Sequence, residues 1–263
     1  MNRPFQWLGR NLAEYLNTPI TTHRPHYLVR PQEFMTILRP GDVLLVEGNT
    51  RISTAIKYLT QSTWSHSALF IGNTMGQGLD AESSPTLVEA DITKGVITLP
   101  LSRYEHFSTR ICRPINLSKT DCERVINYAV SRIGHSYDLK NVFDLARYLL
   151  PTPPVPSFMR RRMLALGSGD PTRAICSTLI AQAFQSVHYP ILPIIEKPSL
   201  KEQIESDTRV NEIHHIRHHS LFTPCDFDLS PYFQVIKPTQ ELGFDYKALT
   251  WNDQLKKKIQ LLS

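Results

Sequence analysis

Cys176 is the residue of this 263-residue chain whose position best suits a nucleophile. The run "RAICSTLIAQAFQSV" predicts a helix over 173–187 with Cys176 in its first turn, where unpaired backbone N–H groups and the helix dipole stabilise a thiolate. Its place at the edge of the apolar helix face equally suits simple packing, since cysteine is among the most buried residue types. The other cysteines show no such placement and are expected to be structural: Cys112, Cys122 and Cys225.

A cysteine nucleophile needs a base, and that base is usually histidine. Most of the 10 histidines lie in polar surroundings or next to proline. His66 differs because it opens the apolar run "HSALFIG" (66–72), a predicted strand that would hold its ring in place. A lone histidine beside an apolar strand is more often structural, so its position alone leaves both interpretations open.

A third group is needed to orient the imidazole. Glu89 lies among apolar neighbours in "LVEADI", on a predicted strand, where a buried carboxylate is costly unless it is paired. Strand alternation puts Glu89 on the face of Leu87 and Asp91, which also fits a side chain that faces solvent. The pattern alone leaves this choice open.

The elements that would position these residues are short strands followed by helices. Apolar patterns predict strands over 41–48, 66–72, 86–92, 95–101, 107–114 and 232–236. Helical spacing predicts helices over 51–61, 117–134, 137–150 and 173–187. This order favours an α+β fold in which a small antiparallel sheet packs against helices.

Composition excludes several classes of function. The net charge of +5 is too small to indicate nucleic-acid binding, and the chain has no glycine-rich phosphate loop, so we expect no nucleic-acid partner. The N-terminal residues lack the apolar core of a signal peptide, and the apolar runs are far shorter than a membrane span. We therefore predict a cytoplasmic protein; the basic amphipathic run "QLKKKIQLL" leaves peripheral membrane contact open.

A histidine-rich run, "NEIHHIRHHS" (211–220), contains pairs four residues apart that would face one side of a helix and hold a metal: His214, His215, His218 and His219. Glu212 is the only acidic residue nearby, and a solvated basic loop is the more frequent case. The four cysteines lack zinc-ligand spacing. We expect neither a metal site nor another cofactor.

Four motifs in order carry a resemblance to a known family: "PGDVLL" (40–45), "WSHSALFIG" (64–72), "LVEADITKGV" (87–96) and "ICSTLIAQAF" (175–184). Over roughly residues 39–236 the chain resembles the circularly permuted, NlpC-type branch of the papain-like cysteine amidases, the YiiX/YaeF-like proteins. The resemblance implies a permuted papain-like catalytic domain over 39–240, preceded by an N-terminal arm over 1–38 and followed by a basic amphipathic tail over 241–263.

The resemblance also implies roles for individual residues. Cys176 would be the nucleophile, His66 its general base and Glu89 the residue that orients the imidazole. Four further residues are expected to line the site: Tyr137, Trp64, Ser65 and Ser177. The histidine precedes the cysteine in this chain, which is compatible with catalysis because only their proximity in space matters.

The first functional prediction is a cysteine hydrolase that cleaves a peptide or peptide-like amide bond through a thiol acyl-enzyme. A second keeps the same cysteine–histidine pair but acts on lipid esters or thioesters, as a hydrolase or acyltransferase, by similarity to the related lecithin retinol acyltransferases. A third is a catalytically inactive binding module. The expected partner is a small peptide, amide or lipid substrate, and the sequence does not specify an oligomeric state.

Overall fold

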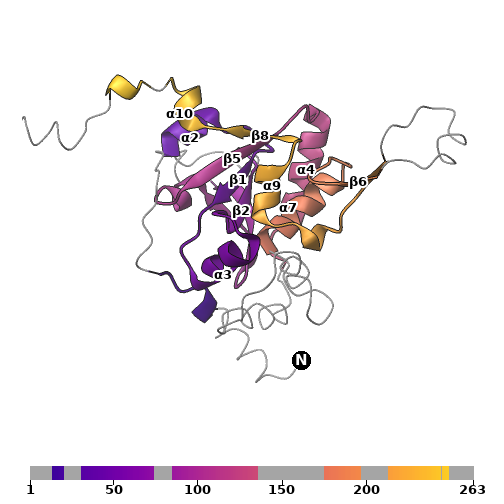
Figure 1. The fold of residues 1–263 in the computed structure, drawn as a ribbon, viewed down its shortest axis with the longest axis horizontal. Helices are drawn as coiled ribbons and strands as arrows, with labels where there is room; N and C mark the ends of the chain where they lie inside the picture. The colour runs from indigo at the N-terminus through magenta and orange to yellow at the C-terminus, as the bar shows by residue number, and fades with distance from the viewer. Residues whose placement is uncertain are drawn as a thin grey trace, which may run out of the picture.

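The computed structural model describes residues 14–20, 31–73, 85–135, 175–196, 213–243 and 245–248. A six-stranded sheet with the order β4-β3-β2-β1-β5-β8 lies at the centre of the described residues (Figure 1). All neighbouring strands in it run antiparallel. The strands are β1 (Val43–Val46), β2 (His66–Phe70), β3 (Pro85–Asp91), β4 (Gly95–Pro100), β5 (Thr109–Pro114) and β8 (Phe233–Ile236). The predicted α+β class with a small antiparallel sheet is confirmed.

The structure also contains these helices and short 3-10 turns: α2 (Pro31–Ile37), α3 (Arg51–Thr60), η1 (Leu101–Tyr104), α4 (Lys119–Ser131), α7 (Ile175–Gln185), η3 (His219–Leu221), α9 (Pro224–Leu229), α10 (Pro238–Glu241) and η4 (Tyr246–Ala248). Side-chain caps begin two of the helices, because Thr50 accepts from the Ser53 N–H in α3 and Ser118 accepts from the Asp121 N–H in α4. In the part of the chain that the structure describes, every helix is too short or too polar to cross a bilayer.

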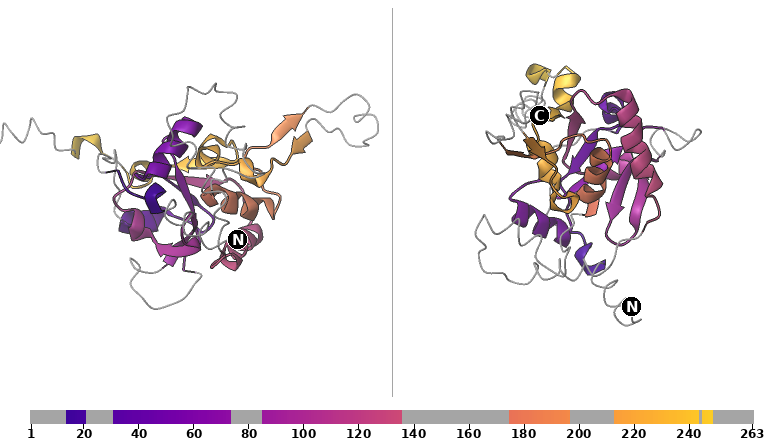
Figure 2. Two further views of the ribbon diagram at one scale, coloured as in Figure 1. Left: turned by 90° about the horizontal axis from the view of Figure 1, so that it is seen from below. Right: turned by 90° about the vertical axis from the view of Figure 1, so that its right-hand side faces the viewer.

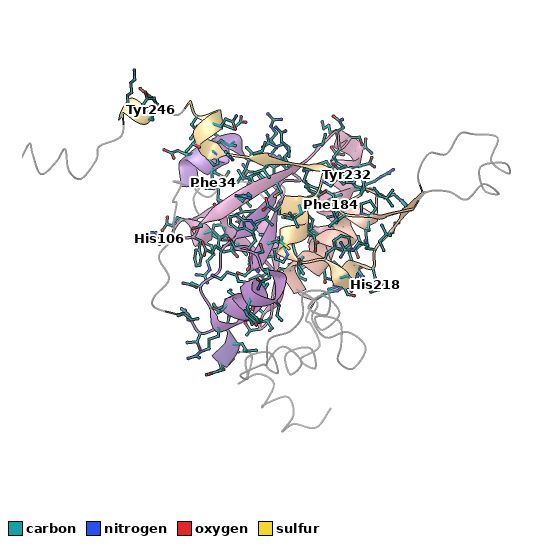
Figure 3. All side chains as sticks on the ribbon, viewed as in Figure 1. Phe34, His106, Phe184, His218, Tyr232 and Tyr246 are labelled. Atoms are coloured by element: carbon teal, nitrogen blue, oxygen red, sulfur yellow. The ribbon has the colours of Figure 1, made fainter. Side chains whose placement is uncertain are left out.

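Both faces of the sheet are buried. Alternate residues of β1 belong to two separate apolar clusters, with Leu45 in one and Leu44 in the other. Side chains of α4 and α7, including Phe184, cover the first face, and side chains of α2, including Phe34, cover the second (Figure 3). Phe34 belongs to the predicted N-terminal arm, so residues of that arm contribute to the core of the sheet.

Strands β2 and β3 pair over only a short distance. β2 pairs with β1 from His66 to Leu69, but with β3 only at Leu69 and Phe70. The first residues of β2 therefore have a neighbouring strand on one side alone. The N-terminus of α7 approaches this open end, which brings a helix terminus next to the start of a strand.

Two further strands, β6 (Ile194–Glu196) and β7 (Ile213–His215), form a hairpin that extends away from the main sheet (Figure 2). The helix considered as one alternative for the histidine-rich run 211–220 is not formed in the described part of that run. His214 and His215 lie in strand β7, and His218 and His219 lie beyond it, at the short 3-10 turn η3. The predicted helix over 137–150 lies outside the described residues.

Candidate active site

Helix α7 places Cys176 at the open end of β2. The helix begins at Ile175, so Cys176 is its second residue, as the sequence pattern predicts. Its backbone N–H therefore belongs to the first turn, whose N–H groups have no acceptor within the helix. The side chain is only 4% exposed, and its sulfur is hydrogen-bonded to His66.

His66 is the first residue of β2, and β1 holds it through pairing with Val46. Its Nε2 lies 2.7 Å from Oε2 of Glu89, on the neighbouring strand β3. Since Nε2 faces Glu89, the contact with Cys176 is left to Nδ1, on the other side of the ring. The three predicted residues are therefore brought together in the order thiol, imidazole, carboxylate.

The buried environment of Glu89 decides between the two alternatives that strand alternation leaves open. Glu89 is 6% exposed although it shares a face with Leu87, because that face is covered by α2 and η1 instead of facing water. Besides His66, the phenolic O–H of Tyr104 donates to the same carboxylate oxygen. A buried carboxylate with two donors is a paired one, which is the condition for its stability.

Ser67 is a contact of the thiol that the sequence analysis missed. Its backbone N–H and its hydroxyl both lie beside Cys176, and both lower the pKa of the thiol. The N–H is available because alternation directs it away from β1, toward the side where β3 does not yet pair with β2. Within the described residues the Ser67 hydroxyl is buried and has no hydrogen-bond partner, although it is close enough to lower the pKa of the Cys176 thiol.

These contacts change the protonation of the site. Burial raises the pKa of the Cys176 thiol, but His66 and Ser67 lower it by more, so the pKa lies below its ordinary value. Burial lowers the pKa of His66, whereas Glu89 and Cys176 raise it well above the ordinary value. The combination favours a thiolate beside an imidazolium. Burial raises the pKa of the thiols of Cys112 and Cys122, which have no such partner.

The carboxylate is held in its charged form as well. Burial raises the pKa of the Glu89 carboxyl, but its contacts with His66 and Tyr104 lower the pKa by more. Burial and the Glu89 charge together raise the pKa of Tyr104 well above its usual value, so that the phenol stays a donor. Tyr104 comes from the turn η1, which follows β4, and no local pattern in the sequence marks it as part of a site.

A cavity of about 170 Å³ opens beside the three residues, and Cys176, His66 and Glu89 all line it. Helix α3 supplies one wall of this cavity, while the end of β3 and the turn η1 supply another. Gly48 also lines it, and an added Cβ there would lie 2.2 Å from the hydroxyl oxygen of Ser53. Only glycine leaves that corner open.

Of the four residues expected to line the site, one lines the cavity, two do not, and one lies outside the described residues. Ser65 lines the cavity, and its hydroxyl accepts the Gly48 N–H at 2.9 Å. Trp64 does not line the cavity, because its indole Nε1 donates to Asp228 and its ring is buried. Ser177 is fully buried and does not line it either, because it points about 100° around the helix from Cys176. Tyr137 lies outside the described residues.

Metal ligands are not grouped in the part of the chain that the structure describes: no set of three His, Cys, Asp or Glu side chains is arranged to hold an ion. A thiolate, a proton donor beside it and a cavity for a substrate are the parts required for nucleophilic attack on an acyl carbon.

Comparison with known proteins gives similarities to one family and to solved structures. Residues 37–148 match a family described as permuted papain-like amidase enzyme, YaeF/YiiX. That segment contains His66 and Glu89 and ends before Cys176. A crystal structure described as metalloprotein yiiX from Escherichia coli O157:H7 aligns with a TM-score of 0.44 at 16% identity, covering 76% of this chain and 96% of that one. No curated protein matches the sequence.

Proposed function

We propose that this chain, whose residues 37–148 match the permuted papain-like amidase family YaeF/YiiX, hydrolyses an amide bond through a thiol acyl-enzyme, with Cys176 as the nucleophile. The observation that carries the proposal is the row of Cys176, His66 and Glu89 at one end of the sheet. The lowered pKa of the thiol and the raised pKa of the imidazole support it.

The first step forms the acyl-enzyme. The Cys176 thiolate attacks the carbonyl carbon of the amide, and the carbonyl π electrons move to oxygen to give a tetrahedral oxyanion. The backbone N–H of Cys176, in the first turn of α7, is the candidate donor to this oxygen. The oxyanion then collapses, the C–N bond breaks, and the His66 imidazolium gives its proton to the departing nitrogen.

The second step regenerates the enzyme. Neutral His66 removes a proton from water as the water oxygen attacks the thioester carbon. Collapse of the second tetrahedral species breaks the C–S bond, releases the carboxylic acid and leaves the thiolate beside the imidazolium. Glu89 keeps the ring oriented throughout, because its contact at Nε2 leaves Nδ1 directed at the sulfur.

The decisive test is the reactivity of the four cysteines toward iodoacetamide as a function of pH. Mass spectrometry of the intact and digested protein reads out each site separately. We expect Cys176 to be alkylated well below the ordinary pKa of a thiol, with Cys122 as the internal reference because burial raises its pKa. In His66→Ala the loss of the imidazolium should slow the alkylation of Cys176 near pH 6 by about tenfold or more.

Equal reactivity of Cys176 and Cys122 at every pH would contradict the proposed nucleophile and favour the inactive binding module. If Cys176 is reactive, labelled substrates separate the remaining alternatives. Accumulation of a phospholipid acyl group on Cys176, with no turnover of amides, would favour the lipid acyltransferase over the amidase.

A further inference from the structure

The position of the His66 imidazolium, which donates the proton to the leaving group, indicates which end of the cavity holds the amine half of the substrate. Resting on the proposed function, the step that breaks the C–N bond requires the nitrogen to be within reach of His66. The departing nitrogen must therefore lie beside Nδ1, close to the sulfur, and the substituent that it carries extends past the imidazole. Because Glu89 holds the opposite edge of the ring at Nε2, the residues around Glu89 line the part of the cavity that lies beyond the imidazole.

Aromatic side chains surround this side of the cavity. The ring of Tyr104, which donates to Glu89, has its centroid 6.1 Å from that of His66. Phe107 packs edge-on against Tyr104 with centroids 5.7 Å apart, and both side chains line the cavity. Phe107 is only half-buried, so part of its ring faces open space that a ligand would cover.

Helix α3 adds a second apolar surface. Ile52 and Ile56 are four residues apart, so they lie on one face of the helix, and that face lines the cavity (Figure 1 shows α3 beside the end of the sheet). Both are half-buried, as is Ile92 at the end of β3. Covering these side chains would remove apolar surface from water, which is a favourable contribution to binding.

The charges in the same region do not favour an ionic ligand. Asp91 and Arg103 both line the cavity and carry opposite charges. Oδ1 of Asp91 is occupied by the backbone N–H groups of Thr93 and Lys94 in the turn that follows β3. With no excess of either sign, discrimination must come from apolar contact.

We infer that the substrate is an amide whose amine half carries an apolar substituent about the size of a butyl or phenethyl group, held between Phe107 and Ile56. Primary amides, which release ammonia, and N-methyl amides would leave these surfaces uncovered. They should therefore be poor substrates.

The test uses six amides: acetyl and octanoyl groups, each joined to methylamine, butylamine and phenethylamine. In both acyl series kcat/KM should rise by about tenfold or more from the methylamide to the phenethylamide. Ile56→Trp, which fills the space, should abolish this gain, and Phe107→Ala should reduce it, each measured as the ratio of kcat/KM for the phenethylamide to kcat/KM for the methylamide within one variant. The matched control is Tyr58→Ala, because Tyr58 lies on α3 outside the cavity lining and is 46% exposed.

The outcomes separate the inference from the function on which it rests. If hydrolysis depends on the acyl chain alone, or if both cavity variants keep the wild-type ratio of phenethylamide to methylamide, the inference is wrong and the amidase stands. If Phe107→Ala does not fold, Ile56→Trp still decides the test, because it fills the cavity without removing a packed side chain. Failure of the wild type to hydrolyse any of the six amides would count against the proposed function itself.

Discussion

Replacing Glu89 by glutamine removes a charge from the site while keeping its shape. His66 and Tyr104 both contact the same oxygen, Oε2. A glutamine carbonyl oxygen in that position can accept from both donors, so the imidazole keeps its orientation. The substitution therefore isolates the electrostatic contribution of the carboxylate.

The expected change in the pKa of His66 follows from its distance to Glu89 and from the burial of both side chains. Nε2 and Oε2 are 2.7 Å apart, and the side chains of His66 and Glu89 are 23% and 8% exposed, so water screens the pair weakly. An opposite charge this close raises the pKa of an imidazole by about 1–3 units. In Glu89→Gln the pKa of His66 should fall by about that amount, and the basic limb of the kcat/KM profile, where His66 loses its proton, should move to lower pH.

The direct assay is an NMR titration of the protein labelled with ¹⁵N in the histidine rings, with the His66 signals identified by their absence in His66→Ala. Glu105→Gln is the matched control: Glu105 pairs with His106 on the surface, where the His106 side chain is 80% exposed. The control should leave the titration of His66 unchanged. A His66 midpoint in Glu89→Gln within about 0.3 units of wild type would refute the view that the carboxylate stabilises the imidazolium.

Three other substitutions test contacts around the triad. Tyr104→Phe removes a donor to Glu89 and should lower kcat about tenfold with little change in KM, a split that steady-state kinetics on one amide can check. Ser67→Ala removes a hydroxyl that lowers the pKa of the Cys176 thiol, so the midpoint of iodoacetamide alkylation should move to higher pH; an unchanged midpoint would show that the hydroxyl does not influence the thiol. Gly48→Ala places a Cβ 2.2 Å from a serine hydroxyl and should lower the free energy of unfolding by about 1–3 kcal/mol, measured in urea.

The strands and helices that carry the triad could be predicted from the sequence because their signals are local. The spacing of apolar residues places β2 and α7 within a few residues of their observed bounds, and thus His66 at a strand start and Cys176 in a first helical turn. These two positions depend only on the residues next to them, and chain order has no influence on either.

The surroundings of Glu89 could not be predicted in the same way. Alternation correctly places it on the face of Leu87, but whether that face is wet or buried depends on α2, whose residues precede β1. The contribution of Tyr104 depends on how η1 folds back against β3. Such contacts depend on how separate elements pack against one another. The spacing of apolar residues within one element does not predict them.

The short pairing of β2 with β3 also makes the Ser67 amide a reporter of the active site. On the side of β3 this N–H has no strand to bond to, and its acceptor is the Cys176 sulfur. Its hydrogen–deuterium exchange should consequently follow the chemical state of the sulfur: slow while the thiolate accepts the bond, and faster once the cysteine is alkylated or acylated. The Ser67 amide, at the point where β2 and β3 stop pairing, would thus report by its exchange rate each change in the chemical state of Cys176 during turnover.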